Sequence, residues 1–212
     1  MREEELAGRR ELIRFARRLD GRGILTSTDG NLSLRLSDES ILITPSGSCK
    51  GMLRRDELVL VQRNGTATGR PSSELGLHRA IYEERPDVRA VIHAHPPHAT
   101  AYAVAGIPLD RAILSEVVLS LGAVPVAPYA KPTGEELADS VRPFVVGHSA
   151  ILLRFHGAVA FSNSVARACF MMETLEHVAQ IDFLSRQMGS ADVLKGADVE
   201  ALREIRRAML SI

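Results

Sequence analysis

The sequence has few of the features that would assign it at once to a secreted or a nucleic-acid-binding class. Its 212 residues include only two cysteines, and Lys+Arg and Asp+Glu are equal at 26 each. Cys49 and Cys169 are too few for a disulfide framework, so they favour a reducing compartment and incidental or buried thiols. Balanced charge argues against a broad basic surface for nucleic acid, so any anionic ligand must be held by a local site.

Long hydrophobic runs are also missing. No segment approaches the roughly 18 apolar residues that a membrane span needs, and the first ten residues, MREEELAGRR, lack the apolar core of a secretory signal. We therefore expect a cytoplasmic protein that binds neither membrane nor nucleic acid. Hydrophobic residues make up 45% and charged residues 25%, which is ordinary for a globular chain that is long enough to bury a core.

Helical and strand-like patterns alternate along the chain. Apolar periodicity predicts helices over residues 4–18, 73–85, 98–104, 134–146, 164–187 and 201–210. It predicts strands over residues 32–36, 40–44, 58–61, 88–93, 124–127, 150–155 and 157–161. No repeat or linker divides the chain. The sequence predicts one α/β domain over residues 1–212, with a mixed or largely antiparallel sheet between helices and a C-terminal helical appendage over about 191–212.

The most informative motif is a histidine pair at the end of a strand-like run. His93 and His95, in VRAVIHAHPP, are two residues apart and so share one face of a strand. Such a pair can bind one metal ion, and the alternative is two packed or solvated histidines. His156 interrupts two apolar runs, where a metal ion or a core hydrogen bond would satisfy its ring. His78 and His177 lie in predicted helices beside charged residues, and solvated helix faces explain them.

Glu74 is the carboxylate of interest for such a site. It follows two serines at a predicted helix N-terminus, where free N–H groups and a partial positive charge favour anions. A simple capping arrangement is the alternative. Three turns share small or hydroxyl residues of this kind: Gly30-Asn31, Ser46-Gly47 and Ser72-Ser73. Together with the histidines they suggest a phosphate cradle beside a metal ion.

Five motifs, taken in order, resemble those of the class II aldolase/adducin family. They are Asp29-Gly30-Asn31-Leu32-Ser33, Thr44-Pro45-Ser46-Gly47, Ser72-Ser73-Glu74, His93-Ala94-His95 and His156-Gly157. The likeness runs from about residue 10 to residue 188. It implies a three-layer α/β/α sandwich around a mainly antiparallel sheet, and a C4 homotetramer with active sites at subunit interfaces.

The resemblance also implies a set of roles in the site. His93, His95 and His156 would bind one Zn²⁺ per subunit, or another divalent metal, with Glu74 as a displaceable fourth ligand and general base. The substrate phosphate would be held by Gly30, Asn31, Ser46, Gly47, Ser72 and Ser73. Three neutral imidazoles with one open position suit a catalytic zinc site.

The implied activity is that of a lyase. A ketose 1-phosphate of the L-fuculose 1-phosphate kind would be cleaved reversibly to dihydroxyacetone phosphate and a short aldehyde, through an enediolate that the metal stabilises. The same scaffold also serves pentulose-phosphate 4-epimerases, sugar-phosphate dehydratases and decarboxylases, and non-catalytic adducin-like modules. The histidines do not separate the enzymes from one another, but their retention with Glu74 argues against the non-catalytic alternative.

The half of the site that would face the aldehyde departs from the family pattern. Leu114 stands where family aldolases carry an acid/base tyrosine. Family aldolases also use a tyrosine in the C-terminal tail, but residues 189–212 contain no tyrosine. Phe155 also precedes His156 where a polar residue is frequent. Our hypothesis is that Glu116 or Tyr129 serves as the replacement proton donor. The alternative for Glu116 is that it caps or solvates a helix.

Overall fold

The sheet of the protein confirms the mixed, mainly antiparallel prediction. The computed structural model describes residues 2–189 and 192–210, and in this part of the chain seven strands follow the order β3-β2-β1-β4-β7-β6-β5. Neighbouring strands are antiparallel except for the parallel pair β5–β6. The strands are β1 (Asn31–Arg35), β2 (Ile41–Ile43), β3 (Val59–Val61), β4 (Ala90–Ala94), β5 (Val126–Ala127), β6 (Ala150–Leu153) and β7 (Gly157–Ser162).

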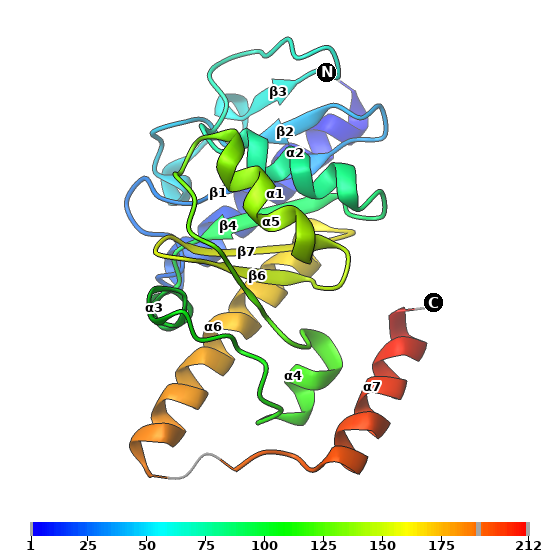
Figure 1. Ribbon diagram of the computed structural model, residues 1–212. Helices are drawn as coiled ribbons and strands as arrows, with labels where there is room; N and C mark the ends of the chain where they lie inside the picture. Colours follow the sequence, from blue (N-terminus) through cyan, green and yellow to red (C-terminus); the bar gives the residue numbers. More distant parts are fainter. Residues whose placement is uncertain (1, 190–191, 211–212) are drawn as a thin grey trace.

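Helices cover both faces of this sheet, as Figure 1 shows. One face packs against α1 (Glu3–Gly21), α3 (Pro97–Ala105) and α6 (Val165–Gln187). The other face packs against α2 (Leu75–Glu84) and α5 (Glu135–Val145). Each layer has its own apolar core, so the expected three-layer α/β/α sandwich is confirmed.

Alternation along β4 decides which core each of its side chains enters. Ala90, Ile92 and Ala94 belong to the core on the α1 and α6 side, whereas Val91 belongs to the core on the α2 and α5 side. Successive side chains of a strand point to opposite faces, so His93 shares the face of Val91. The histidine motif is therefore presented toward α2.

Antiparallel pairing brings three strand ends to one edge of the sheet. His93 near the end of β4 pairs with Asn31 at the start of β1 and with Val159 of β7. Ala94 pairs with Ala158, one residue beyond the start of β7. The segments with Gly30, His95 and His156 consequently meet at this edge.

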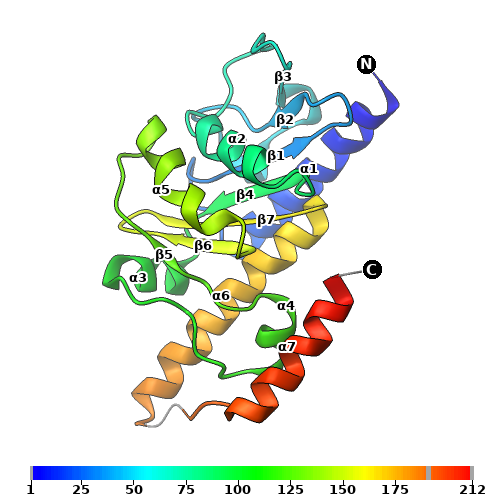
Figure 2. The same cartoon turned by 45° about the vertical axis from the view of Figure 1, so that its right-hand side comes forward.

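Three short elements were not predicted: α4 (Ser115–Ser120), η1 (Lys50–Met52) and η2 (Arg55–Glu57). The C-terminal helix α7 (Gly196–Leu210) begins earlier than predicted and packs against α4 (Figure 2). Arg206 joins the two helices, since its Nη2 donates to the Leu121 carbonyl at 3.0 Å. Residues 191, 211 and 212 of the predicted appendage lie outside the described residues. No described helix has the length and apolar character that a membrane crossing requires.

Candidate metal centre

Three histidines converge where β4 ends and β7 begins. The ring centroids of His93, His95 and His156 are 4.6 to 5.1 Å apart, and the Nε2 atoms of His93 and His95 are separated by 3.1 Å. One potential ligand atom from each residue lies within 4.8 Å of those of the other two. Neither cysteine belongs to this group, and Cys169 is buried elsewhere. The predicted histidine triad is thus assembled in space.

Glu74 faces the same group from the N-cap position of α2. Its side chain makes no capping hydrogen bond. Instead, Oε1 lies 3.1 Å from His156 Nε2, and Oε2 lies 3.3 Å from His93 Nε2. Burial would raise the pKa of this carboxyl, but contacts with His156, His93 and Asn31 outweigh burial and hold the pKa well below its usual range. An ionised carboxylate therefore closes the group of histidines.

Two of the histidines, His93 and His95, are held in the neutral form that a metal ion requires. Burial lowers the pKa of His93 to about 3, and burial together with the neighbouring His156 lowers the pKa of His95. His93 Nδ1–H donates to the Ala158 carbonyl at 2.9 Å, which leaves the Nε2 lone pair facing the other rings. Three imidazoles and one carboxylate form a donor set that fits a catalytic divalent metal.

Two glycines allow the backbone to approach this centre closely. A Cβ atom on Gly157 would lie 2.5 Å from His95 Cδ2 and 2.6 Å from the Ala94 carbonyl oxygen. Gly30 has a φ of +72°, and a Cβ atom there would lie 2.7 Å from the His93 carbonyl oxygen. Larger residues at either position would displace the segments that carry the histidines.

The turns at 45–47 and 71–73, two of the three predicted to bind phosphate, lie side by side. A β-bridge joins Pro45 to Pro71, and the Ser46 N–H donates to the Arg70 carbonyl at 3.2 Å. Ser72 is buried and accepts a hydrogen bond from the Glu74 N–H at 3.3 Å. Gly47, with a φ of +72°, and Ser73 are exposed at the same edge. The predicted phosphate residues of these two turns therefore border the metal group.

The third turn, at residues 28–31, is tied to this edge by Asn31 and by Lys50. Asn31 Nδ2 donates to Glu74 Oε2 at 2.6 Å, and Lys50 Nζ donates to the Thr28 carbonyl oxygen. Lys50 is only 3% exposed. Burial lowers its pKa, while Asp29, Cys49 and Glu74 act in the opposite direction. No role for this cation was predicted from the sequence, although it is one of three lysines and lies three residues after Gly47.

The expectation for His78 was wrong. Its charged neighbours predict a solvated helix face, but its side chain is fully buried between α2 and β1. Its Nδ1 lies 2.6 Å from Ser33 Oγ, and its Nε2 contacts Asn31 Oδ1. The available signal was helical spacing, since His78 lies four residues before the buried Tyr82 and beside the buried Leu77. His177, by contrast, is exposed as expected.

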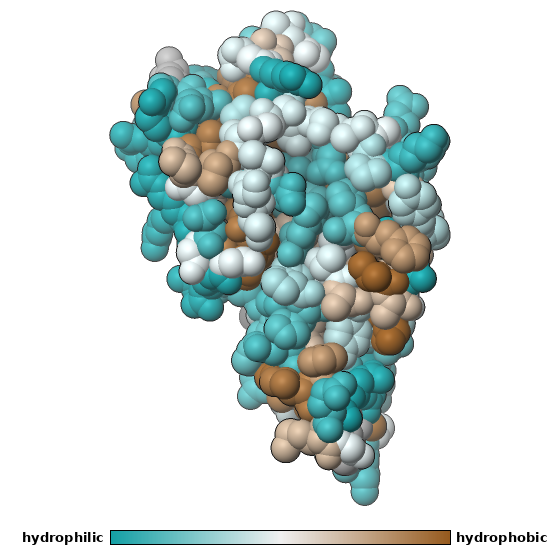
Figure 3. All heavy atoms as spheres, turned by 90° about the vertical axis from the view of Figure 1, so that its left-hand side faces the viewer, coloured by the Kyte–Doolittle hydropathy of each residue, from teal (hydrophilic) through white to brown (hydrophobic). Residues whose placement is uncertain are grey.

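The two candidate proton donors differ in their relation to the centre. The Tyr129 ring lies 6.1 Å from that of Phe155, the residue before His156. Both rings are exposed, and Phe155 has a left-handed φ of +56°. Glu116 is exposed on α4 and makes no described side-chain contact with the histidines or Glu74. On the side of the molecule shown in Figure 3, hydrophobic residues form small groups among hydrophilic ones.

The chain is similar to enzymes of known name in both sequence and structure. The chain is 33% identical over 186 residues to a 3-oxo-tetronate 4-phosphate decarboxylase of Pectobacterium atrosepticum. The aligned region covers 85% of each protein. It is 31% identical over 201 residues to a 5-methylthioribulose-1-phosphate/5-deoxyribulose-1-phosphate aldolase of Rhodospirillum rubrum, with 94% of this chain and 90% of the relative covered. The structure of an L-fuculose 1-phosphate aldolase has a TM-score of 0.86 at 31% identity and covers 93% of this chain and 95% of its own.

The family itself is matched over most of the chain. The sequence model described as "Class II Aldolase and Adducin N-terminal domain" matches residues 10–183, which include the histidine triad, Glu74 and all three turns. Class II aldolases depend on a metal ion, and the triad described above could hold one. The resemblance expected from five short motifs is confirmed, and this protein belongs to the class II aldolase and adducin N-terminal domain family.

Proposed function

We propose that this protein is a metal-dependent lyase that acts on a short phosphorylated sugar or keto acid and breaks the bond between the carbon next to the carbonyl and the carbon beyond it. The bond would break to leave the enediolate of dihydroxyacetone phosphate. The observation that carries the proposal is the meeting of three imidazoles with an ionised Glu74, whose two oxygens lie 3.1 and 3.3 Å from two of the rings.

In this proposal His93, His95 and His156 hold a zinc ion, and Glu74 is a fourth, displaceable ligand. When bound, the ion supplies a Lewis acid that stabilises negative charge on the substrate oxygens. Glu74 then acts as the general base, because its low pKa leaves it ionised at neutral pH. In the direction of condensation it takes a proton from the hydroxymethyl carbon of dihydroxyacetone phosphate, and in cleavage it returns that proton.

The substrate phosphate would be bound by the three turns beside the metal group. These turns offer hydroxyl and N–H donors, and the bound phosphate would fix the carbonyl relative to Glu74. Lys50, which donates to the Thr28 carbonyl of the third turn, would add a positive charge at this edge. The proposed contacts come from Gly30, Asn31, Ser46, Gly47, Ser72 and Ser73.

Carbon dioxide is the first candidate for the group that leaves. In a 3-oxo-tetronate 4-phosphate, the C1–C2 bond breaks, its electron pair forms the C2–C3 enediolate, and protonation at C2 gives dihydroxyacetone phosphate. This reaction removes no hydroxyl proton, so it needs no acid/base tyrosine on the side where Leu114 stands. The similarity to a decarboxylase of that substrate supports this candidate.

Aldol cleavage of a ketose 1-phosphate is the second candidate, and the position of Tyr129 favours it. Breaking the C3–C4 bond to release an aldehyde requires a base for the C4 hydroxyl proton. Tyr129 lies against Phe155, next to a proposed metal ligand, and Glu116 would reach the substrate only from another subunit. As the family resemblance implies, the proposal includes a C4 homotetramer of single-domain chains with interfacial sites, and light scattering measures the size of the assembly.

One set of assays separates these candidates. The zinc-loaded protein is incubated in D₂O with dihydroxyacetone phosphate, and deuterium at the hydroxymethyl carbon reports the step that both reactions share. Release of carbon dioxide from 3-oxo-tetronate 4-phosphate then identifies a decarboxylase, and condensation with an aldehyde panel identifies an aldolase. Failure of deuterium exchange in zinc-loaded protein, with wild-type folding by circular dichroism, would contradict the proposed function.

A further inference from the structure

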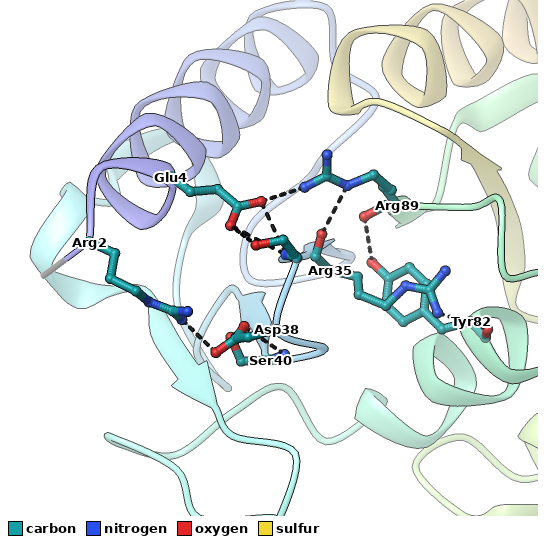
Figure 4. Close-up of polar contacts among 8 residues, drawn as sticks. Arg2, Glu4, Arg35, Asp38, Ser40, Tyr82 and Arg89 are labelled. Carbon is teal, nitrogen blue, oxygen red and sulfur yellow. Dashed lines mark hydrogen bonds and ion pairs between the residues drawn. The ribbon is translucent and has the colours of Figure 1, made fainter.

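A chain of buried polar side chains leads away from Glu74 into the layer between β1 and α2. Asn31 Nδ2 donates to Glu74 Oε2 at 2.6 Å, and Asn31 Oδ1 contacts His78 Nε2. Ser33 Oγ lies 2.6 Å from both His78 Nδ1 and the Tyr82 hydroxyl. All five side chains are buried, and His78 and Ser33 are 0% exposed. At the far end, the Tyr82 hydroxyl lies 3.3 Å from the Arg89 carbonyl oxygen (Figure 4).

The carboxylate of Glu74 determines the direction of the hydrogen bonds along this chain. An ionised carboxylate only accepts, so Asn31 presents its amide N–H to Glu74 and its Oδ1 to His78. Because Oδ1 also only accepts, His78 must carry a proton on Nε2. The flipped amide of Asn31 would instead set two acceptors against each other at 2.6 Å, in a site where an unsatisfied polar group is costly.

The remaining hydrogen bonds follow from the neutral state of His78. Burial lowers the pKa of its imidazole to about 4, so the ring carries a single proton at neutral pH. With that proton on Nε2, Nδ1 has a lone pair and accepts from the Ser33 hydroxyl. Ser33 Oγ has then given its own proton to Nδ1, so it accepts the single Tyr82 hydroxyl proton across 2.6 Å in preference to the Arg89 carbonyl oxygen at 3.3 Å. Each nitrogen of the buried ring thus has one partner of the correct kind.

We propose that His78 is a positioning residue, whose Nε2–H tautomer holds the Asn31 amide in the orientation that directs its N–H to Glu74. The proposal rests on the proposed function only for the roles of Asn31 and Glu74 in the site. His78 does not touch the histidine triad, and it acts through Asn31 alone. If His78 did not present its Nε2–H, nothing on the side away from Glu74 would favour one orientation of the Asn31 amide over the other.

The tautomer can be measured directly in the wild-type protein. In protein labelled with ¹⁵N-histidine, long-range ¹H–¹⁵N correlation spectra of the zinc-free and zinc-loaded forms distinguish the two neutral tautomers and the protonated ring. We expect His78 to be neutral with its proton on Nε2 at pH 7 in both forms. A proton on Nδ1, or on both nitrogens, would overturn the proposal whatever reaction the protein catalyses.

A matched pair of variants tests the effect on Asn31. The amide nitrogen of His78→Gln lies near the position of Nε2, whereas that of His78→Asn lies near the position of Nδ1, so only the glutamine can donate to Asn31. We expect His78→Gln to bind inorganic phosphate as the wild type does, and His78→Asn to bind it about tenfold more weakly, the value of one hydrogen bond. Equal losses in both variants would show a merely structural role and overturn the proposal.

Two further measurements separate positioning from general damage. In an Asn31→Ala background, His78→Asn should cause no additional loss of phosphate affinity, and an additive loss would contradict action through Asn31. Tyr102→Phe, which removes a 2.5 Å hydrogen bond to the buried Asp182, is the control: it should lower Tm and leave phosphate binding unchanged. If lyase assays fail while the tautomer and the glutamine/asparagine difference hold, the reaction assignment falls and the positioning role stands.

Discussion

The close approach of Gly157 to the metal centre leads to a prediction for Gly157→Ala. The new Cβ atom would lie 2.5 Å from His95 Cδ2 and 2.6 Å from the Ala94 carbonyl oxygen. Ordinary carbon contacts begin at about 3.4 Å, so His95 or β7 must move by about 0.9 Å. Neither neighbour is a flexible side-chain end: one is the backbone of β4 and the other is a proposed metal ligand.

The size of the effect follows from the tolerance of metal coordination. Zinc–nitrogen bonds are about 2.0–2.1 Å long, and a misplacement of about 1 Å in a reacting group costs roughly 10²-fold in rate. Overpacking of this kind costs about 1–3 kcal/mol of folding stability. We therefore expect Gly157→Ala to remain folded, to bind zinc more weakly by about 10–100-fold, and to lose about 10²-fold in kcat/KM.

The assay is a zinc competition titration with a chromophoric chelator, followed by turnover at saturating zinc. Gly147→Ala is the matched control, because a Cβ atom there meets nothing within 4 Å and the residue has no left-handed φ. The control should retain wild-type zinc affinity. Wild-type zinc affinity and turnover in Gly157→Ala would refute the reasoning, since His95 would then not depend on the missing Cβ.

Three further predictions concern charge and protonation in the site. Lys50→Met should keep its zinc and raise KM for a phosphorylated substrate about tenfold, the value of one charge-assisted hydrogen bond; unchanged inhibition by inorganic phosphate would exclude this role. Glu74→Gln should slow deuterium exchange into dihydroxyacetone phosphate by about 10²–10⁴-fold, and exchange at the wild-type rate would exclude Glu74 as the base. In metal-free protein the free energy of unfolding should fall as the pH drops from 6.5 to about 4, because His78 is protonated in the unfolded chain but not in the folded one. Urea titrations should show that His78→Gln removes about 3 kcal/mol of this loss. That value is the difference between the unfolded pKa of 6.5 and the folded pKa of about 4, at ~1.36 kcal/mol per pKa unit. Equal losses in the wild type and the variant would contradict a neutral, buried His78.

Much of the metal centre was predictable because strand periodicity is a local property. Alternation alone places His93 and His95 on one face, and the register of β4 with β7 places His156 beside them. No local pattern gives that register, however. The motif order suggested the convergence, and the pairing of Ala94 with Ala158 accounts for it.

The burial of His78 does not follow from its charged sequence neighbours, which predict a solvated face. A helix has several faces, and Arg79 lies about 100° around the axis from His78. The positions that share the face of His78 are Glu74 and Tyr82, one turn away on each side. Both are buried, so their spacing was the better guide.

Lys50 and α4 were missed for a different reason. Lys50 is buried by contacts between the turns at 28–31 and 46–50, which are brought together only by the pairing of β1 with β2. The six residues of α4 are too few to show a helical period, and the helix is covered by α7 from the other end of the chain. Long-range packing, rather than local sequence, decides both features.

The pairing of β4 with β7 has a consequence for how the protein folds in the cell. A slip of one residue between these strands would shift His156 by about 3.3 Å along its neighbour and reverse the faces of the β7 side chains. The three imidazoles would then no longer share a coordination sphere. If the proposed triad binds a metal ion during synthesis, the ion would stabilise chains in the native register only, so the supply of the metal would select correctly paired molecules before any substrate is turned over.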